Sequence, residues 1–166
     1  MNADELDPDP EVLRKSFRQA MGSVAAAVSV VTTLHAGTPY GTTVSAFASL
    51  SMEPPMLLVS LDRTSNLLAT LRPGSRVGVN VLAAHHDQIA LRFAGKGDDK
   101  FRDIAWELQD GVPALADRHA WVSMDVEQLV PAGDHVLVLG LVRAADVSAS
   151  APLTYWQRTF GTHHAF

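Results

Sequence analysis

The hydroxyl side chains between Gly41 and Ser51 are the residues of this chain best suited to bind a polar, planar ligand. In an extended strand, successive side chains point to opposite faces. A row of hydroxyls on one face could hydrogen-bond a planar heterocycle and its phosphate tail. The same pattern also describes the solvated outer face of an ordinary strand, so the pattern alone leaves both interpretations open. The residues expected to share that face are Thr43, Ser45, Phe47, Ser49 and Ser51.

A second polar group lies in the run Leu61–Asn66, which combines hydroxyl, amide, carboxylate and guanidinium groups. This run is predicted to join a strand to the start of a short helix, where free N–H groups and the helix dipole favour an anion. Ser65 is the predicted N-cap of that helix, a role that is compatible with anion binding. The run Arg92–Ala94 adds a cation beside an aromatic ring, and by itself it indicates only a helix end.

Histidines and aromatic residues supply further candidates. The turn Gly133–His135 would place His135 at the rim of a sheet, where an imidazole can hydrogen-bond a ligand or position a reactant. Residues 152–161 form an aromatic tail, in which we interpret Trp156 and Phe160 as packing in a core or a dimer interface. The histidine pairs at 85–86 and 163–164 lack the spacing of metal-binding motifs, because adjacent side chains diverge on helices and strands. We therefore expect no metal site.

Composition and absent motifs disfavour several classes of protein. The chain has 13 Lys and Arg against 18 Asp and Glu, and its net charge of -5 opposes nucleic-acid binding. It has no cysteine, which excludes disulfides, thiolate metal sites and a cysteine nucleophile. The G-x-G-x-x-G fingerprint, the P-loop and the G-x-S-x-G elbow are also missing. A Rossmann dehydrogenase, a P-loop enzyme and an α/β-hydrolase all lose support.

The elements that must position these residues are typical of a small β-barrel. An amphipathic helix is predicted over 11–21, and short helices are predicted over 67–71 and 86–93. The segments around 101–106 and 111–113 give no clear prediction. Many strands joined by turns indicate a closed or nearly closed antiparallel barrel rather than a parallel sheet. The predicted strands cover 24–33, 40–51, 56–61, 76–82, 120–130 and 135–147.

The length of 166 residues suits one domain with one core. Residues 1–10 are rich in acidic residues and proline, and we expect them to form a disordered tail before a single domain over 11–166. The tail lacks the basic start and apolar run of a signal peptide, and no apolar stretch approaches the ~20 residues that span a bilayer. These features lead us to expect a cytoplasmic protein.

Several segments, taken together and in order, resemble the flavin reductase domain family, known as the reductase component of two-component flavin-dependent monooxygenases. No single segment is specific, but their order and spacing cover nearly the whole chain. The matching segments are Phe17–Gly22, Val30–Thr33, Gly41–Phe47, Ser51–Pro55, Arg63–Asn66, Val79–Leu82, Arg92–Ala94, Gly133–His135 and Tyr155–Gly161.

The resemblance implies a mainly β fold: a homodimeric antiparallel split β-barrel of Greek-key type with a few short helices, the FMN-binding split barrel. It also implies an NAD(P)H-dependent flavin reductase that binds FMN, with FAD possible. NADH or NADPH would donate a hydride to flavin N5, and reduced flavin would then pass to a transient monooxygenase partner. Such chemistry needs little acid–base machinery, because the cofactors carry it.

The site residues implied by the resemblance lie in five segments. His135 is the expected catalytic residue and, with Arg158, a candidate for nicotinamide and flavin binding. Hydroxyls of Thr43 and Ser45 are expected at the flavin ring, and the segment 65–66 with Arg92 at the phosphate. The full set of expected cofactor-binding residues is Thr42, Thr43, Val44, Ser45, Ala46, Ser49, Ser60, Leu61, Asp62, Thr64, Ser65, Asn66, Arg92, Phe93, Ala94 and Arg158.

Two other functions on the same barrel stay open at this point. One is an oxidase with a permanently bound flavin and a separate organic substrate. The other is a non-catalytic module that carries flavin or haem. The choices between FMN and FAD and between NADH and NADPH are equally open, because no ribose-reading acidic residue can be placed without a Rossmann unit. The identity of the oxygenase is open as well.

Overall fold

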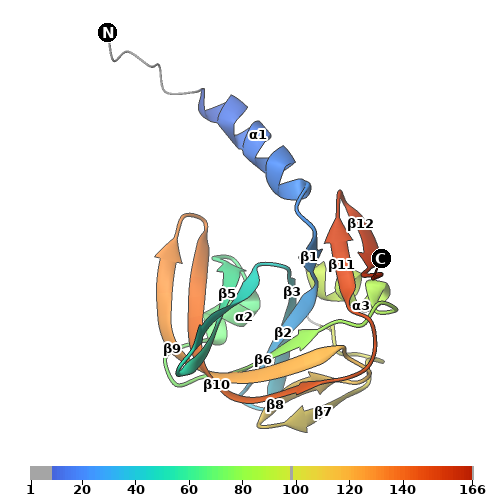
Figure 1. Cartoon of the computed structure of the whole chain (residues 1–166). Coiled ribbons are helices and arrows are strands. Elements are labelled where there is room, and N and C mark those ends of the chain that lie inside the picture. The colour runs from blue at the N-terminus through green and yellow to red at the C-terminus, as the bar shows by residue number, and fades with distance from the viewer. Residues whose placement is uncertain (1–8, 98, 166) are drawn as a thin grey trace.

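A computed structural model describes residues 9–97 and 99–165 of the chain. Most of the predicted disordered tail, residues 1–8, lies outside the described residues. The described part forms a β-barrel with one helix projecting from it and a small three-stranded sheet at the base of that helix (Figure 1). The predicted mainly β, antiparallel fold with a few short helices is confirmed.

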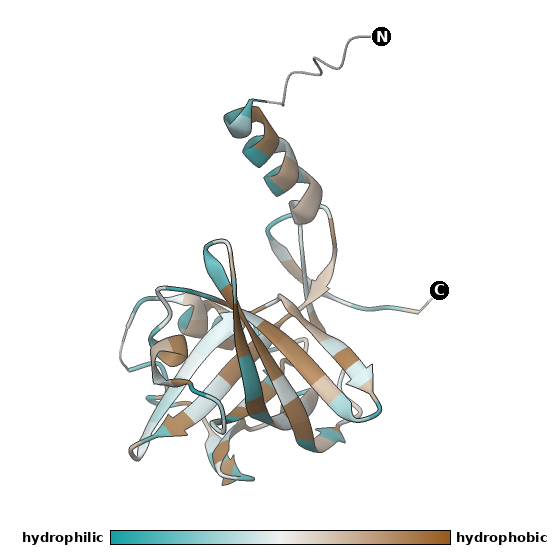
Figure 2. Cartoon of the chain, turned by 90° about the vertical axis from the view of Figure 1, so that its left-hand side faces the viewer, coloured by the Kyte–Doolittle hydropathy of each residue, from teal (hydrophilic) through white to brown (hydrophobic). Residues whose placement is uncertain are grey.

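The first helix, α1 (Pro10–Gly22), agrees with the predicted amphipathic helix and begins one residue earlier. Asp9 caps it by accepting a hydrogen bond from the backbone N–H of Glu11 at 2.8 Å. Proline suits the first helical position, where an N–H has no intrahelical partner. None of its residues is buried, although it carries apolar side chains along its length (Figure 2). The helix therefore leaves an apolar face uncovered.

Seven antiparallel strands form the main sheet, in the order β3-β2-β6-β9-β10-β5-β4. The hairpins β2–β3 and β9–β10 and the predicted strands over 56–61 and 76–82 are confirmed. The strand predicted over 24–33 is divided, because residues 26–27 pair with Tyr155 and Thr154 in a separate sheet and only 29–35 belong to the main sheet. The two edge strands, β3 and β4, follow one another in the sequence, so the sheet must curl to bring its edges together. The strands are β2 (Ser29–His35), β3 (Thr38–Val44), β4 (Phe47–Met52), β5 (Pro55–Asp62), β6 (Arg76–Val81), β9 (Ala120–Ala132) and β10 (His135–Val147).

The single strand predicted over 40–51 is wrong, because the chain turns a corner at Ser45 and Ala46. Before the corner, β3 pairs with β2; after it, β4 pairs with β5. The backbone N–H of Ser60 donates to the carbonyl of Ala46 at 2.8 Å and fixes the corner to β5. The row of hydroxyls predicted on one strand face is therefore split between the two edges of the sheet.

Two short helices lie at the ends of strands. The first, α2 (Asn66–Thr70), has Ser65 as its N-cap, as predicted, and the Ser65 Oγ accepts from the N–H of Leu68 at 3.4 Å. The second, α3 (Asp87–Ala94), confirms the other short helix and buries Ala90 against β3. Both helices lie over the barrel and close off its apolar interior.

Two smaller sheets complete the fold. The hairpin of β7 (Trp106–Gln109) and β8 (Val112–Leu115) occupies the region that gave no clear prediction. The other sheet joins β1 (Ala26–Ala27), β11 (Leu153–Trp156) and β12 (Thr159–Thr162), and contains the predicted aromatic tail.

A buried amide holds β8 on the barrel. Asn80 of β6 is fully buried, and its Nδ2 donates to the carbonyls of Val30 at 3.1 Å and Pro113 at 3.4 Å. Its Oδ1 accepts from the backbone N–H of Leu115 at 2.8 Å. Buried polar groups need such partners, because an unpaired one costs about 1–3 kcal/mol. The amide therefore fixes the position of the β7–β8 hairpin.

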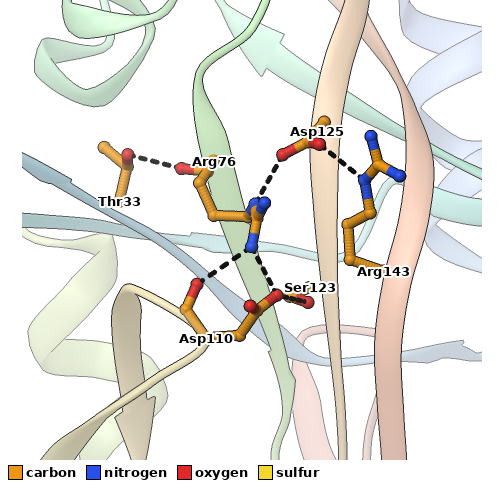
Figure 3. Close-up of polar contacts among 6 residues, drawn as sticks. All are labelled: Thr33, Arg76, Asp110, Ser123, Asp125 and Arg143. Carbon is orange, nitrogen blue, oxygen red and sulfur yellow. Dashed lines mark hydrogen bonds and ion pairs between the residues drawn. The ribbon is translucent and has the colours of Figure 1, made fainter.

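An ion-pair cluster on the sheet secures the other end of that hairpin (Figure 3). Arg76 contacts the carboxylate of Asp110 at 2.6 Å and that of Asp125 at 2.5 Å. Arg143 contacts the second oxygen of Asp125 at 2.5 Å, and Ser123 donates to Asp110. Because Asp110 lies in the β7–β8 turn, the cluster joins that turn to β6, β9 and β10.

Candidate functional site

The corner between β3 and β4 opens into a cavity of about 220 Å³. Its walls come from the corner itself, from the end of β5, from the α2 cap and from the start of β10. Every lining residue belongs to the set expected from the sequence. They are Thr42, Thr43, Val44, Ser45, Ala46, Ser60, Leu61, Asp62, Ser65 and His135.

A second cavity, of about 300 Å³, adjoins the first and shares Thr43 and Ser45 with it. Of the expected residues, Ala94 and Arg158 also line it. Five lining residues were not expected from the sequence: Val28, Ala90, Leu91, Tyr155 and Phe160. The first three carry no polar side chain, so nothing in the sequence marked them. Tyr155 and Phe160 lie in the aromatic tail. The sequence predicts a packing role for Phe160, whereas the structure places it at the second cavity.

The two shared residues differ in what their hydroxyls can still do. The Thr43 Oγ1 donates its proton to the carbonyl of Ala90 in α3 at 2.6 Å, so toward a ligand it can only accept. In the described part of the chain, the Ser45 hydroxyl makes no hydrogen bond, and it lies at the corner between both cavities. Ser45 is therefore the shared hydroxyl that can donate to a ligand.

A tight turn after β5 forms the polar end of the first cavity. The Asp62 carboxylate accepts from both the N–H and the hydroxyl of Thr64, each at 2.7 Å. These bonds lower the pKa of Asp62, and its electrostatic interactions with His135 and Lys96 lower it further. Thr64 thus faces Asp62 rather than the cavity. The Ser65 Oγ accepts its capping bond and keeps a proton that it can donate to an anion.

His135 is held beside that turn by its neighbours. Its Nδ1 lies 2.7 Å from the carboxylate of Asp134, and this hydrogen bond lowers the pKa of Asp134. The carbonyl of Asp134 also accepts from the backbone N–H of Arg63 at 3.1 Å, so the two turns are joined. With Nδ1 engaged, Nε2 is the ring nitrogen left for a ligand.

Five expected residues line neither cavity: Ser49, Thr64, Asn66, Arg92 and Phe93. Ser49 lies beyond the corner, on β4. Phe93 is fully buried and meets Phe101 edge to face, with ring centroids 4.9 Å apart. The Arg92 guanidinium donates to the backbone carbonyl of Arg102. Their part in cofactor binding stays a prediction.

Neither a metal centre nor a membrane helix is found in the described residues. Over 9–97 and 99–165, no group of three or more histidine, aspartate or glutamate side chains could hold a metal ion. Within the same ranges, no helix is long and apolar enough to cross a membrane. The two cavities are lined by hydroxyls, one carboxylate, one histidine, one arginine, aromatic rings and apolar side chains.

Comparison with known proteins shows the family of this chain. The family model described as a flavin reductase like domain matches residues 21–164. The chain belongs to this family. A flavin reductase (NADH) from Kitasatospora aureofaciens is 40% identical over 151 residues, which cover 87% of this chain and 79% of that protein. The reductase component of a 4-nitrophenol 4-monooxygenase/4-nitrocatechol 2-monooxygenase from Rhodococcus opacus is 34% identical over 148 residues, 89% of this chain and 80% of that one.

A solved structure of the flavin reductase fold also superposes closely. The NADH:FAD oxidoreductase SgcE6 from Streptomyces globisporus, in complex with NAD and FAD fragments, matches with a TM-score of 0.85 and 28% identity. The match covers 94% of this chain and 95% of that one. The predicted membership of the flavin reductase family and the predicted split-barrel fold are thereby confirmed.

Proposed function

We propose that this chain is an NAD(P)H:flavin oxidoreductase that reduces FMN or FAD. The observation that carries the proposal is the pair of adjoining cavities that share Thr43 and Ser45. Together they fall within the ~300–1,000 Å³ range of small-molecule sites. Two planar partners held in adjoining cavities would meet at the shared corner, as hydride transfer requires.

The side chains present fit a flavin in the first cavity. Its lining offers the hydroxyls of Ser45, Ser60 and Ser65 as donors and the hydroxyl of Thr43 as an acceptor. A flavin ring, with donor and acceptor groups on its edge, suits the corner, and the phosphate suits the Ser65 end. The second cavity, with Tyr155 and other apolar walls, suits the nicotinamide.

A bound flavin supplies the hydride acceptor at N5, and the nicotinamide supplies the hydride. The protein has to orient the two rings and exclude water between them. Ser45 is the donor at the shared corner. His135 lines the first cavity and has Nε2 left for a ligand, while Arg158 brings a positive charge to the second cavity that suits the diphosphate of a dinucleotide.

The first experiment follows absorbance of NADH and NADPH in the presence of free FMN and free FAD. Nicotinamide oxidation that depends on added flavin supports the reductase and identifies both cofactors. Tight flavin binding without oxidation would instead favour the oxidase or the flavin carrier. A protein that neither binds nor reduces flavin would refute the proposal.

A variant tests the phosphate end of the site. Replacing Ser65 and Asn66 together by alanine should weaken FMN binding, measured by quenching of flavin fluorescence. The single variant Thr162→Val serves as a control, because Thr162 lies in the C-terminal hairpin and lines neither cavity. Unchanged FMN affinity in the double variant would contradict the assignment of the phosphate end.

We also infer that the protein is a homodimer, and the support is the uncovered face of α1. Leu13, Phe17 and Met21 lie at helical spacing and are each more than half exposed. A helix of 13 residues is marginal in water without packing. A second copy carries the same surface and could cover it isologously. Phe17→Asp should then lower the mass measured by light scattering, whereas Gln19→Asp on the same helix should not.

A monooxygenase is the partner that we propose for the reduced flavin, and the support is the relative that is a monooxygenase reductase component. Reduced flavin from this chain should sustain substrate oxygenation by such an oxygenase in a coupled assay. Because the nicotinamide donor is a cytoplasmic metabolite, we propose that the enzyme works in the cytoplasm.

A further inference from the structure

The turn that carries Arg158 has an unusual backbone. Gln157 and Arg158 connect β11 to β12, and both have positive φ, 47° and 64°. A two-residue hairpin turn of this kind prefers Asn-Gly or Gly-Gly, because side chains crowd the backbone in the left-handed region. Neither residue here is one that favours this conformation. Something outside the turn must therefore hold it.

Two hydrogen bonds fasten this turn to the end of α1. The backbone N–H of Gln157 donates to the carbonyl of Gly22 at 3.0 Å. The indole N–H of Trp156 donates to the carbonyl of Ser23 at 2.9 Å. Below them, β1 runs beside β11, and the N–H of Val28 donates to the carbonyl of Leu153 at 3.0 Å. The segment after α1 thus supports the hairpin from its turn to its base.

The other face of the hairpin forms part of the second cavity. Tyr155 and Phe160 are directly paired across the two strands, with ring centroids 5.1 Å apart, and both line that cavity together with Arg158. Side chains alternate along a strand, so Trp156 points away from the face of Tyr155. Trp156 is half exposed, at 50%, and lines neither cavity.

We propose that Trp156 is a positioning residue, whose bond to the end of α1 holds the strained turn so that Arg158 stays at the second cavity. The proposal rests on the proposed function only in taking the second cavity as the nicotinamide site. Trp156 acts through the backbone, without touching a substrate. The flavin side of the site does not depend on it.

The variant Trp156→Phe removes the indole N–H and keeps an aromatic ring. The KM for NADH should rise about 3- to 10-fold, the effect of one lost hydrogen bond, while kcat at saturating NADH and the FMN dissociation constant change less than 2-fold. Thr162→Val is the matched control: it removes a hydrogen bond to the Pro152 carbonyl at the far end of the same hairpin. Its KM should equal that of the wild type.

A second substitution distinguishes positioning from general loosening. Asparagine tolerates positive φ better than glutamine does, so Gln157→Asn in the Trp156→Phe background should recover at least half of the lost NADH affinity. An unchanged KM in Trp156→Phe would overturn the proposal. Equal losses of FMN and NADH affinity, or no recovery in the double variant, would overturn it too.

Hydrogen–deuterium exchange tests the same point without turnover. The amide of Gln157 and the segment 158–160 should exchange faster in Trp156→Phe than in the wild type, and at the wild-type rate in Thr162→Val. Unchanged exchange would overturn the positioning role. If the wild type showed no flavin-dependent NADH oxidation, the proposed function would fail, and exchange alone would still decide the role of Trp156.

Discussion

Adding one methyl group at Gly41 should loosen the contact between β3 and α3. Gly41 lies in β3, and a Cβ atom there would come within 2.6 Å of the Phe93 ring and 3.1 Å of the Phe101 ring. Ordinary contacts begin at 3.4 Å, so the Phe93 ring would have to move by about 0.8 Å. It cannot move outward freely, because Phe93 is fully buried. In Gly41→Ala, the helix α3, which carries Phe93, must therefore shift together with the ring.

The magnitude follows from overpacking of a close-packed core, which costs about 1–3 kcal/mol. For a chain of this size, about 1 kcal/mol lowers the melting temperature by roughly 2–4 °C. At the middle of this range, about 2 kcal/mol, we expect Gly41→Ala to melt about 4–8 °C below the wild type. Because α3 contributes Ala90, Leu91 and Ala94 to the second cavity, the KM for the nicotinamide should rise as well.

Circular dichroism melts and urea unfolding would measure the loss of stability. Gly161→Ala is the matched control, since its Cβ would meet only the Thr154 Oγ1, at 3.7 Å. Phe93→Leu should create the space that the new methyl needs, so Gly41→Ala should cost less in that background. This account would be refuted if the losses of stability from Gly41→Ala and Phe93→Leu were additive in the double variant. It would also be refuted if Gly161→Ala were as unstable as Gly41→Ala.

Three further results are expected. Asn80→Ala leaves a buried backbone N–H without its acceptor, and should lower the free energy of unfolding in urea by about 3 kcal/mol. Burial alone raises the pKa of Asp125, but hydrogen bonds from Arg76 and Arg143 outweigh it and hold the pKa below 3.8. The ionised carboxylate thus stabilises the fold above about pH 3.8, and this stabilisation is lost as pH falls through the lower pKa that Asp125 has in the folded protein. The free energy of unfolding should therefore fall less steeply below pH 4 in Asp125→Asn than in the wild type. Ser45→Ala should weaken FMN binding about 5-fold by fluorescence titration, and an unchanged affinity would remove Ser45 from the flavin site.

Much of the fold could be predicted because its signals are local. The N-cap at Ser65 and the tight turn before His135 are recognisable from a few adjacent residues. The corner at Ser45 is not, because the residues on both sides are typical of a strand and only the pairing of β4 with β5 bends the chain there. The β7–β8 hairpin does carry a local signal, because Asp110 and Gly111, both at positive φ, form the two-residue turn that is typical of hairpins.

The first cavity could be predicted from the sequence, whereas the second could be predicted only in part. All residues around the first cavity belong to the set of site residues that the resemblance to the family implies. The second cavity depends on Val28, on one face of α3 and on the hairpin of Tyr155, which come together only through long-range pairing. Its turn at 157–158 also lacks the glycine or asparagine that would have indicated a hairpin.

The two residues shared by the cavities offer a route for thermodynamic linkage between their occupants. Thr43 and Ser45 belong to both walls, so a ligand that fixed their arrangement in one cavity would alter the free energy of binding in the other. This coupling must be equal in both directions. If flavin and nicotinamide favour the same arrangement of the corner, departure of the oxidised nicotinamide also weakens retention of the reduced flavin. Release of one product would then promote release of the other, which suits the proposed transfer of reduced flavin to a partner oxygenase.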